Sequence, residues 1–141
     1  MIIKRIKIVL FVCYILFILW TTIFSRHSTD VHKTEFRLMW SYREMFVGEP
    51  TWRIDVLQNI ANILFFLPFG FLYPATKYHV ALISGLILSI LIETIQYIAC
   101  LGLCELDDVL CNGLGTFIGC FLISFINNKF NRDNKDEKIN S

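Results

Sequence analysis

The stretch SILIETIQYI, residues 89–98, is apolar enough to lie in lipid, yet Glu93 stands near its middle. The chain of 141 residues is 55% hydrophobic and only 18% charged, which indicates a membrane protein. A charge at the centre of a bilayer costs about 2.5–3.5 kcal/mol on the insertion scale. We therefore expect Glu93 to face protein or water rather than lipid.

Four segments are long and apolar enough to cross a hydrocarbon core of about 30 Å, which takes about 20 residues in a helix. They are residues 6–24, 56–73, 80–103 and 109–126. The first is interpreted as an uncleaved anchor, because its apolar stretch is long for a signal peptide and no convincing cleavage site follows it. The sequence predicts an all-α, polytopic membrane domain over residues 1–126. The polar tail, residues 127–141, is expected to be a frayed helix end followed by disorder.

Lysine and arginine are distributed unevenly between the loops, which predicts the orientation of the chain. Five basic residues lie in the first loop and none in the loop after the third span, whereas eight lie on the side of both termini. Those eight are Lys4, Arg5, Lys7, Lys77, Lys129, Arg132, Lys135 and Lys138. We therefore expect a bacterial cytoplasmic-membrane protein with both termini in the cytoplasm.

The first loop contains EFRLMWSYREMFVGEP, residues 35–50. Phe36, Met39, Trp40 and Val47 would share one face of a helix, which fits a short helix in the membrane interface that ends before Gly48 and Pro50. Trp40 and Tyr42 would anchor it at the interface. A plain loop with scattered anchoring aromatics is the alternative.

Polar residues inside the spans converge on the outer half of the membrane in this topology. In the third span, Ser89, Glu93, Gln96 and Tyr97 form one stripe at helical spacing. The second and fourth spans begin at the same face, where their N-termini would stabilise a negative charge. The sequence predicts a polar pocket between the last three spans. Its candidate ligand-binding residues are Glu93, Gln96, Asp107, Asp108, Asn112, Asn62 and Asn59.

Each of these residues also has a structural interpretation. Asp107 or Asp108 would be a good N-cap for the fourth span, and the amides would join neighbouring helices. Residues interpreted as structural from the start are Pro68, Gly70, Gly113, Gly115 and Gly119. Pro68 would kink the second span. Gly115 and Gly119 form a small-xxx-small pair, which suits close packing within the chain or between two copies.

Catalytic and metal-binding patterns are weak. Cys100, Cys104 and Cys111 have no histidine near them in the sequence, so we predict no metal and no cofactor. A Cys100–Cys104 disulfide would be strained across one helical turn. Glu93 with the aspartate pair supplies an acid and a base but no nucleophile, so no catalytic residue is assigned and enzyme activity is left open. The net charge of +1 does not suggest nucleic acid.

Three motifs resemble the successive signatures of the VanZ-like family of bacterial membrane proteins. They are NIANILFFLPFGFLYP (59–74), SILIETIQ (89–96) and ELDDVLCNGLGTFIG (105–119), and LMWSYREMF (38–46) is similar to a loop segment of that family. The resemblance covers roughly residues 31–125. Many members have an arginine about where Gly102 stands here. The resemblance implies an association with resistance to teicoplanin, a lipoglycopeptide antibiotic, but it does not supply a reaction.

The preferred hypothesis is that the pocket binds an amphiphile: a membrane lipid, a lipid-linked cell-wall precursor or the lipoglycopeptide itself. The first alternative is an enzyme that acts on a lipid-linked envelope substrate through Glu93 and Asp107 or Asp108. The second is a structural assembly partner that needs no pocket chemistry.

Overall fold

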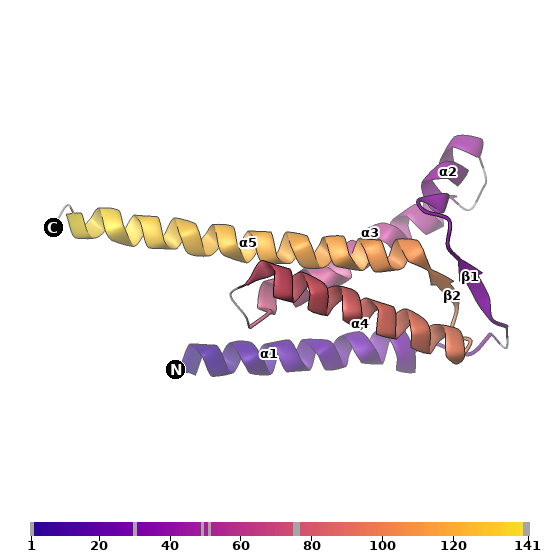
Figure 1. The fold of residues 1–141 in the computed structure, drawn as a ribbon, viewed down its shortest axis with the longest axis horizontal. Helices are drawn as coiled ribbons and strands as arrows, with labels where there is room; N and C mark the ends of the chain where they lie inside the picture. Colours follow the sequence, from indigo (N-terminus) through magenta and orange to yellow (C-terminus); the bar gives the residue numbers. More distant parts are fainter. Residues whose placement is uncertain (1, 30, 49, 51, 75–76, 140–141) are drawn as a thin grey trace.

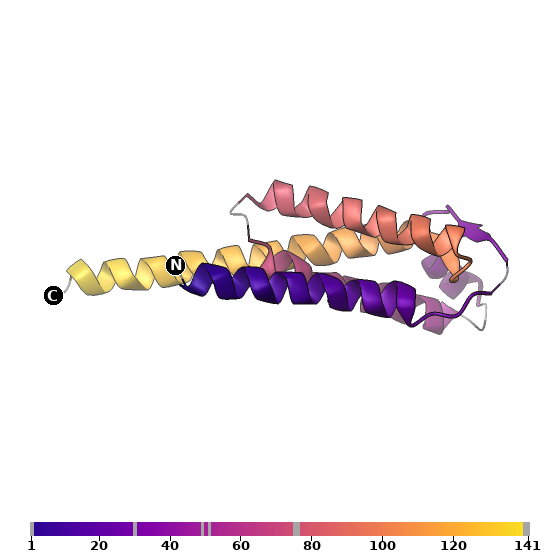
Figure 2. The same ribbon diagram turned by 90° about the horizontal axis from the view of Figure 1, so that it is seen from below.

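The computed structural model describes residues 2–29, 31–48, 50, 52–74 and 77–139, and the chain forms a bundle of long helices (Figure 1). The elements in chain order are α1 (Ile2–Leu19), the π-helical turn η1 (Trp20–Phe24), β1 (Lys33–Glu35), α2 (Trp40–Val47), α3 (Trp52–Leu72), α4 (Tyr78–Ile98), β2 (Leu103–Glu105) and α5 (Leu106–Ile139). Figures 1 and 2 show β1, β2 and α2 together at one end of the bundle. We call this the strand end, and the opposite end, where both termini lie, the terminal end.

Four helices in the described part of the chain are long and apolar enough to cross a membrane. They are Lys4–Phe24, Trp52–Leu72, Tyr78–Ile98 and Leu106–Phe130. The first of them joins α1 to η1, and the others correspond to α3, α4 and the first part of α5. This confirms the prediction of an all-α, polytopic membrane protein.

Two helix ends differ from the sequence prediction. The third span ends at Ile98 rather than Leu103, because Cys100 (φ 54°) and Gly102 (φ 143°) turn the chain into β2. The backbone of α5 continues to Ile139, so most of the tail expected to fray and become disordered is helical. Residues 120–139 contain neither glycine nor proline, so nothing in their sequence stops the helix.

The loop of residues 25–51 is more structured than expected. The strands β1 and β2 pair in parallel, with Lys33 opposite Leu103 and Glu35 opposite Glu105, and no sequence signal predicted them. The short helix forms as α2, but it begins only at Trp40. Phe36 and Met39 therefore precede the helix, and the predicted four-residue apolar face does not form. Gly48 follows α2 with φ 82°, a conformation that favours glycine.

The closest helix contact lies between α3 and α5, where glycines bring the two backbones together. A Cβ atom placed on Gly115 would lie 2.2 Å from the carbonyl oxygen of Ile63, and one on Gly119 would lie 2.0 Å from that of Leu67. Gly70 on α3 meets the backbone of Thr116 in the same way. Gly115 and Gly119 are thus buried within the chain, and the alternative contact with a second copy would require this packing to open. Pro68 lies inside α3, which continues past it to Leu72.

The first helix, α1, packs against α3 through aromatic side chains. Phe11 contacts the rings of Phe69 and Tyr73, and the hydroxyl group of Tyr14 donates a hydrogen bond of 2.5 Å to the carbonyl oxygen of Phe65. Most of the remaining surface of α1 is apolar and exposed, as expected for a helix that faces lipid.

We predict that Gly119→Ala destabilises the protein by about 1–3 kcal/mol, because the added methyl group would overlap backbone atoms of α3 that cannot move independently. Gly113→Ala is the matched control on the same helix. Its Cβ would meet only the side chain of Leu86, which can adjust its rotamer. The unfolding midpoint in detergent and the abundance in membranes measure both effects. Equal losses from the two variants would contradict the proposed role of the α3–α5 contact.

The bundle geometry also permits a direct test of orientation. Reporter fusions after Gly48 and at Gly102, both at the strand end, should read as extracytoplasmic, and fusions at Lys77 or the C-terminus as cytoplasmic. The reason is the excess of basic residues at the terminal end. A cytoplasmic signal from the Gly102 fusion would reverse the predicted topology.

Candidate functional site

Buried polar side chains gather at the strand end and along the contacts of α3, α4 and α5. Among the residues whose burial the structure describes, nine polar or charged ones are buried: Asn59, Ser89, Glu93, Gln96, Glu105, Asp107, Asp108, Asn112 and Thr116. Six of the seven candidate ligand-binding residues are in this set, and the seventh, Asn62, is half-buried beside Asp108. Four acids, Glu93, Glu105, Asp107 and Asp108, are buried here, and we call them the carboxylate cluster.

Glu93 supports the backbone that connects β2 to α5. Its Oε2 atom accepts a hydrogen bond of 3.1 Å from the backbone N–H of Glu105. The bond satisfies an N–H group that would otherwise lie buried without an acceptor, and it gives the buried carboxylate a backbone donor in addition to the side chain of Cys104. The intramembrane acid of the opening stretch therefore faces protein and has a polar partner.

The two aspartates connect α5 to other elements. Asp108 accepts a hydrogen bond of 2.6 Å from the side-chain amide of Asn62 on α3, and Asp107 accepts one of 2.7 Å from the backbone N–H of Met39, next to α2. Both aspartates lie inside the first turn of α5, so neither occupies the N-cap position proposed as an alternative. Their charges still favour this helix end through its dipole.

The predicted amides do not all face one pocket. Gln96 donates a hydrogen bond of 2.9 Å to the carbonyl oxygen of Thr22, which ties α4 to η1. Asn112 donates one of 2.8 Å to the hydroxyl group of Ser89, which ties α5 to α4. These two residues join helices, as their structural interpretation predicted. Tyr97, the fourth residue of the stripe, is exposed.

Glu105 was missed by sequence reasoning, although it begins the third motif. It immediately precedes α5 in a segment expected to be loop, but the structure pairs it with Glu35 of β1 and buries it. The indole N–H of Trp40 donates a hydrogen bond of 3.0 Å to its Oε2 atom. Burial and the nearby charge of Asp108 raise the pKa of Glu105 to about 7, while the bond from Trp40 opposes that rise. Trp40, predicted to be an interfacial anchor, is thus half-buried against this acid.

Arg26 is the second residue that the sequence did not reveal. A Cβ atom on Gly102 would lie 3.1 Å from Nη1 of Arg26, so the guanidinium group of Arg26 lies directly beside Gly102. Its positive charge interacts favourably with Glu93 and Asp108. The first loop therefore brings a cation beside Gly102 and near the acids of α4 and α5.

Residues of the carboxylate cluster line two cavities. The larger, which we call the α4–α5 groove, has a volume of about 590 Å³. It is lined by Thr34, Phe36, Ile90, Glu93, Thr94, Tyr97, Cys104, Glu105, Leu106 and Val109. The smaller, of about 150 Å³, is lined by Met39, Tyr42, Asn59, Ile63, Asp107, Leu110, Cys111 and Leu114. Residues of α4 and α5 line the larger groove, and residues of α3 and α5 line the smaller cavity, so neither of these two cavities is bounded by all three helices. The single pocket between three spans stays a prediction.

The cysteines at this end are free thiols. Cys100 and Cys104 form no disulfide with each other, and burial raises the pKa of the Cys104 thiol. His32, distant in the sequence, has its Nδ1 atom 3.3 Å from the sulfur of Cys100. No group of three histidine, cysteine or acidic residues that could hold a metal ion is present in the described part of the chain.

We predict that Glu105→Gln makes the protein more stable at pH 8 than the wild type, with a smaller difference at pH 5. The folded-state pKa of about 7 lies above the ordinary value of 4.5, so the folded protein binds the proton more tightly. The stability contributed by Glu105 is therefore present below pH 4.5 and lost as the pH rises through about 7. Glutamine retains an acceptor for Trp40 without the charge that faces Asp55, Asp107 and Asp108.

The matched control for this experiment is Glu35→Gln, on the paired strand directly opposite Glu105. Hydrogen bonds from Arg37 lower the pKa of Glu35 to about 2, so its titration lies below the pH range tested. The measurement is the unfolding midpoint in detergent at both pH values. A Glu105→Gln variant whose midpoint follows that of the wild type at both pH values would refute the assignment of this titration to Glu105.

Comparison with known proteins supports the resemblance seen in the motifs. The VanZ/LLP1 family profile matches residues 11–127, which include the whole carboxylate cluster and Arg26. Protein VanZ from Enterococcus faecium is 27% identical over 122 residues, covering 84% of this chain and 67% of that protein. No solved structure matches the chain significantly. Because the family match extends over far more than half of its length, the chain belongs to the VanZ/LLP1 family.

Proposed function

We propose that the protein binds an amphiphile from the membrane, with the acyl chain in the α4–α5 groove and the head group at the carboxylate cluster. The observation that carries this proposal is the composition of the groove. Ile90, Leu106 and Val109 form part of an apolar wall, and Glu93 and Glu105 supply carboxylates within the same cavity. A mainly apolar cavity with a few convergent polar groups is typical of ligand sites.

The polar groups favour a head group that donates hydrogen bonds. Carboxylate oxygens accept hydrogen bonds from hydroxyl and ammonium groups, and these bonds are strong when one partner is charged. Glu105 has a pKa of about 7, so it is present in both protonation states near neutral pH. Arg26, near Glu93, adds a cation for an acidic group on the same ligand. Such a combination suits a sugar- or peptide-bearing lipid better than a simple hydrocarbon.

The family resemblance implies resistance to teicoplanin, and we propose that occupancy of the groove is how this chain contributes to it. Teicoplanin carries an acyl chain on a polar glycopeptide, and lipid-linked cell-wall precursors have the same division between tail and head. Either ligand would present its tail to the apolar wall and its hydroxyl or amino groups to the carboxylates.

We predict that Ile90→Trp, which fills the groove, lowers teicoplanin resistance, whereas Ile87→Trp does not. The two isoleucines lie one turn apart on α4 and are equally exposed, at 52% and 53%, but only Ile90 lines the groove. The assay is the teicoplanin susceptibility of cells that make each variant, normalised to the amount of protein in the membrane. Native mass spectrometry of the purified variants should also measure how much co-purified lipid or added lipoglycopeptide each variant binds. Equal behaviour of the two variants would remove the groove from the proposal.

The charge of Glu93 is tested by Glu93→Gln. Glutamine keeps an acceptor for the N–H group of Glu105 but cannot carry a negative charge. If the anion contacts the head group, resistance should fall sharply while the protein still accumulates. Glu93→Ala, which also removes the acceptor, should reduce abundance as well. Normal resistance of Glu93→Gln at normal abundance would leave Glu93 with a structural role only.

One observation favours the enzyme alternative. A carboxylic acid with a pKa near 7 inside a ligand groove is suited to proton transfer at neutral pH, and Glu105 has that property. Binding and catalysis differ in their products. Overproduction of a binding protein leaves the chemical composition of lipid and precursor pools unchanged, whereas an enzyme alters it. Profiling those pools in deletion and overproducing strains distinguishes the two functions.

A further inference from the structure

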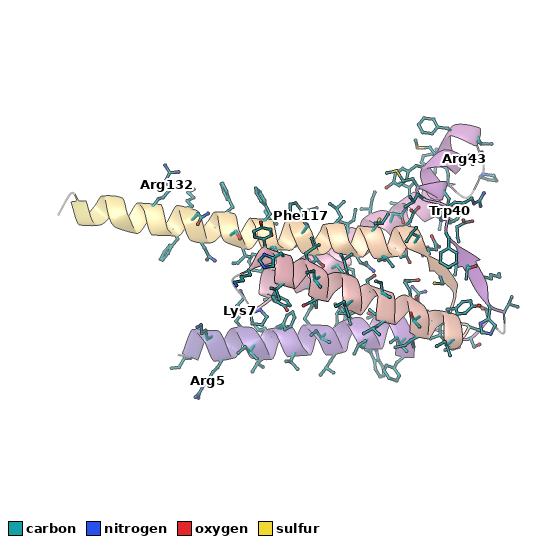
Figure 3. The ribbon with its side chains drawn as sticks, in the orientation of Figure 1. Arg5, Lys7, Trp40, Arg43, Phe117 and Arg132 are labelled. Atoms are coloured by element: carbon teal, nitrogen blue, oxygen red, sulfur yellow. The ribbon has the colours of Figure 1, made fainter. Side chains whose placement is uncertain are left out.

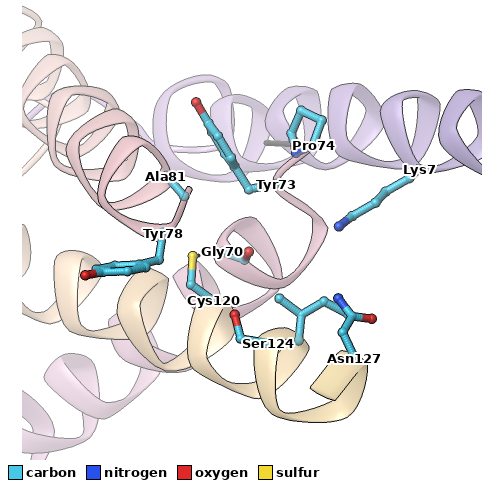
Figure 4. Close-up of a pocket in the computed structure, with 10 residues that line it drawn as sticks. Lys7, Gly70, Tyr73, Pro74, Tyr78, Ala81, Cys120, Ser124 and Asn127 are labelled. Atoms are coloured by element: carbon cyan, nitrogen blue, oxygen red, sulfur yellow. Dashed lines mark hydrogen bonds between the residues drawn. The ribbon is translucent and has the colours of Figure 1, made fainter. Parts of the chain in front are cut away.

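A second polar cavity lies near the terminal end, far from the carboxylate cluster. Its volume is about 150 Å³, and α1, α3, α4, α5 and the residues after α3 all contribute to its wall. We call it the terminal cavity, and Figure 4 shows Lys7 extending toward it from α1 while Cys120, Ser124 and Asn127 approach it from α5. The hydroxyl group of Tyr73, another lining residue, is already paired with that of Ser84 at 2.7 Å.

Lys7 gives the terminal cavity its charge. Of the described residues in the lining, Lys7 is the only one with a charged side chain. It is half-buried, and Figure 3 shows it directed toward the bundle, whereas Arg5 points away from it. The ammonium group is near enough to Cys120 to interact with it electrostatically. Because the described lining residues include no acid, this partly desolvated ammonium group favours an anion as the ligand.

The start of α4 reinforces this preference. Tyr78, the first residue of the helix, and Ala81 both line the terminal cavity. Lys77, at the N-cap position, makes no side-chain hydrogen bond to the helix. The positive end of a helix of 21 residues therefore faces the same region as Lys7. Ser124 and Asn127 add neutral hydrogen-bond donors.

An apolar groove adjoins the terminal cavity on the outside of the bundle. It has a volume of about 320 Å³ and is lined by Tyr78, Phe117, Cys120, Phe121 and Ser124, so we call it the Phe117 groove. Tyr78, Cys120 and Ser124 line both spaces. A cationic, hydrogen-bonding cavity thus lies next to an apolar groove, with three side chains common to both. A free anion would use only the first of these two spaces, whereas a phospholipid would use both.

We propose that the terminal cavity binds the phosphate group of an anionic phospholipid and that an acyl chain of that lipid lies in the Phe117 groove. Lys7 and the N-terminus of α4 meet the phosphate, and Ser124 and Asn127 hydrogen-bond to its oxygens or to the head group. The exposed residues Lys4, Lys77 and Lys129 neighbour these positions in the sequence and attract an anionic leaflet. This site shares no residue with the α4–α5 groove and does not rest on the function proposed for it.

The experiment compares three probes on the purified, full-length protein in detergent at constant ionic strength. They are dioctanoyl phosphatidylglycerol, dioctanoyl phosphatidylcholine and inorganic phosphate, and the unfolding midpoint is followed during each titration. The unchanged protein should bind the phosphatidylglycerol at least about tenfold more tightly than the phosphatidylcholine, and phosphate alone should have little effect. Equal affinity for the two lipids overturns the proposal. An equal effect of inorganic phosphate shows a free-anion site and overturns the lipid assignment.

Variants locate the effect. Lys7→Gln should lose the tenfold preference, whereas Lys7→Arg, which keeps the charge, and Lys4→Gln, which removes an exposed charge one turn away, should retain it. Ser124→Phe is a second route, because it fills the junction of the two spaces and leaves Lys7 in place. A loss from Lys4→Gln as large as that from Lys7→Gln would show a diffuse surface effect and refute a defined site. Retention by Ser124→Phe would refute the placement in the cavity and groove.

Discussion

The backbone contact between α3 and α5 is the constraint on which the rest of the structure depends. Helices inside a bilayer gain little from hiding apolar surface from one another, because lipid is equally apolar, so close packing has to supply the attraction. Gly70, Gly115 and Gly119 allow carbonyl groups of one helix to meet the other helix directly. This contact fixes the first turn of α5 beside α3, and it places Asp108 within hydrogen-bonding distance of Asn62.

The strand end and the carboxylate cluster depend on each other. Each buried acid accepts a hydrogen bond from a different element: Glu93 from β2, Glu105 from Trp40 of α2, Asp107 from the residue before α2, and Asp108 from α3. A sheet of two strands with three residues each would be unstable in isolation. The acids stabilise it by binding its flanking groups, and those groups reduce the cost of burying the acids. The residues that we propose as ligand-binding therefore also hold the fold together.

Local patterns predicted the parts of the structure that have local causes. Apolar length located the four spans, and helical spacing identified Ser89, Glu93 and Gln96 as one buried stripe. The parallel pairing of β1 with β2, the burial of Glu105 and the position of Arg26 arise from contacts between residues about 70 positions apart, for which a single sequence carries no periodic signal. Both paired strands contribute residues to the α4–α5 groove, so its lining could not be predicted without this pairing.

The contact between α4 and α5 explains why the two proposed sites lie at opposite ends. A Cβ atom on Gly85 would lie 2.4 Å from Oγ1 of Thr116, and one on Gly113 would lie 2.7 Å from the side chain of Leu86. These tight contacts occupy the middle of the helix pair, between the α4–α5 groove on one side and the Phe117 groove on the other. Each groove therefore opens to the lipid near its own end of the bundle. Since carboxylates line one cavity and Lys7 lines the other, the two proposed sites would select head groups of opposite charge at the two ends of the bundle.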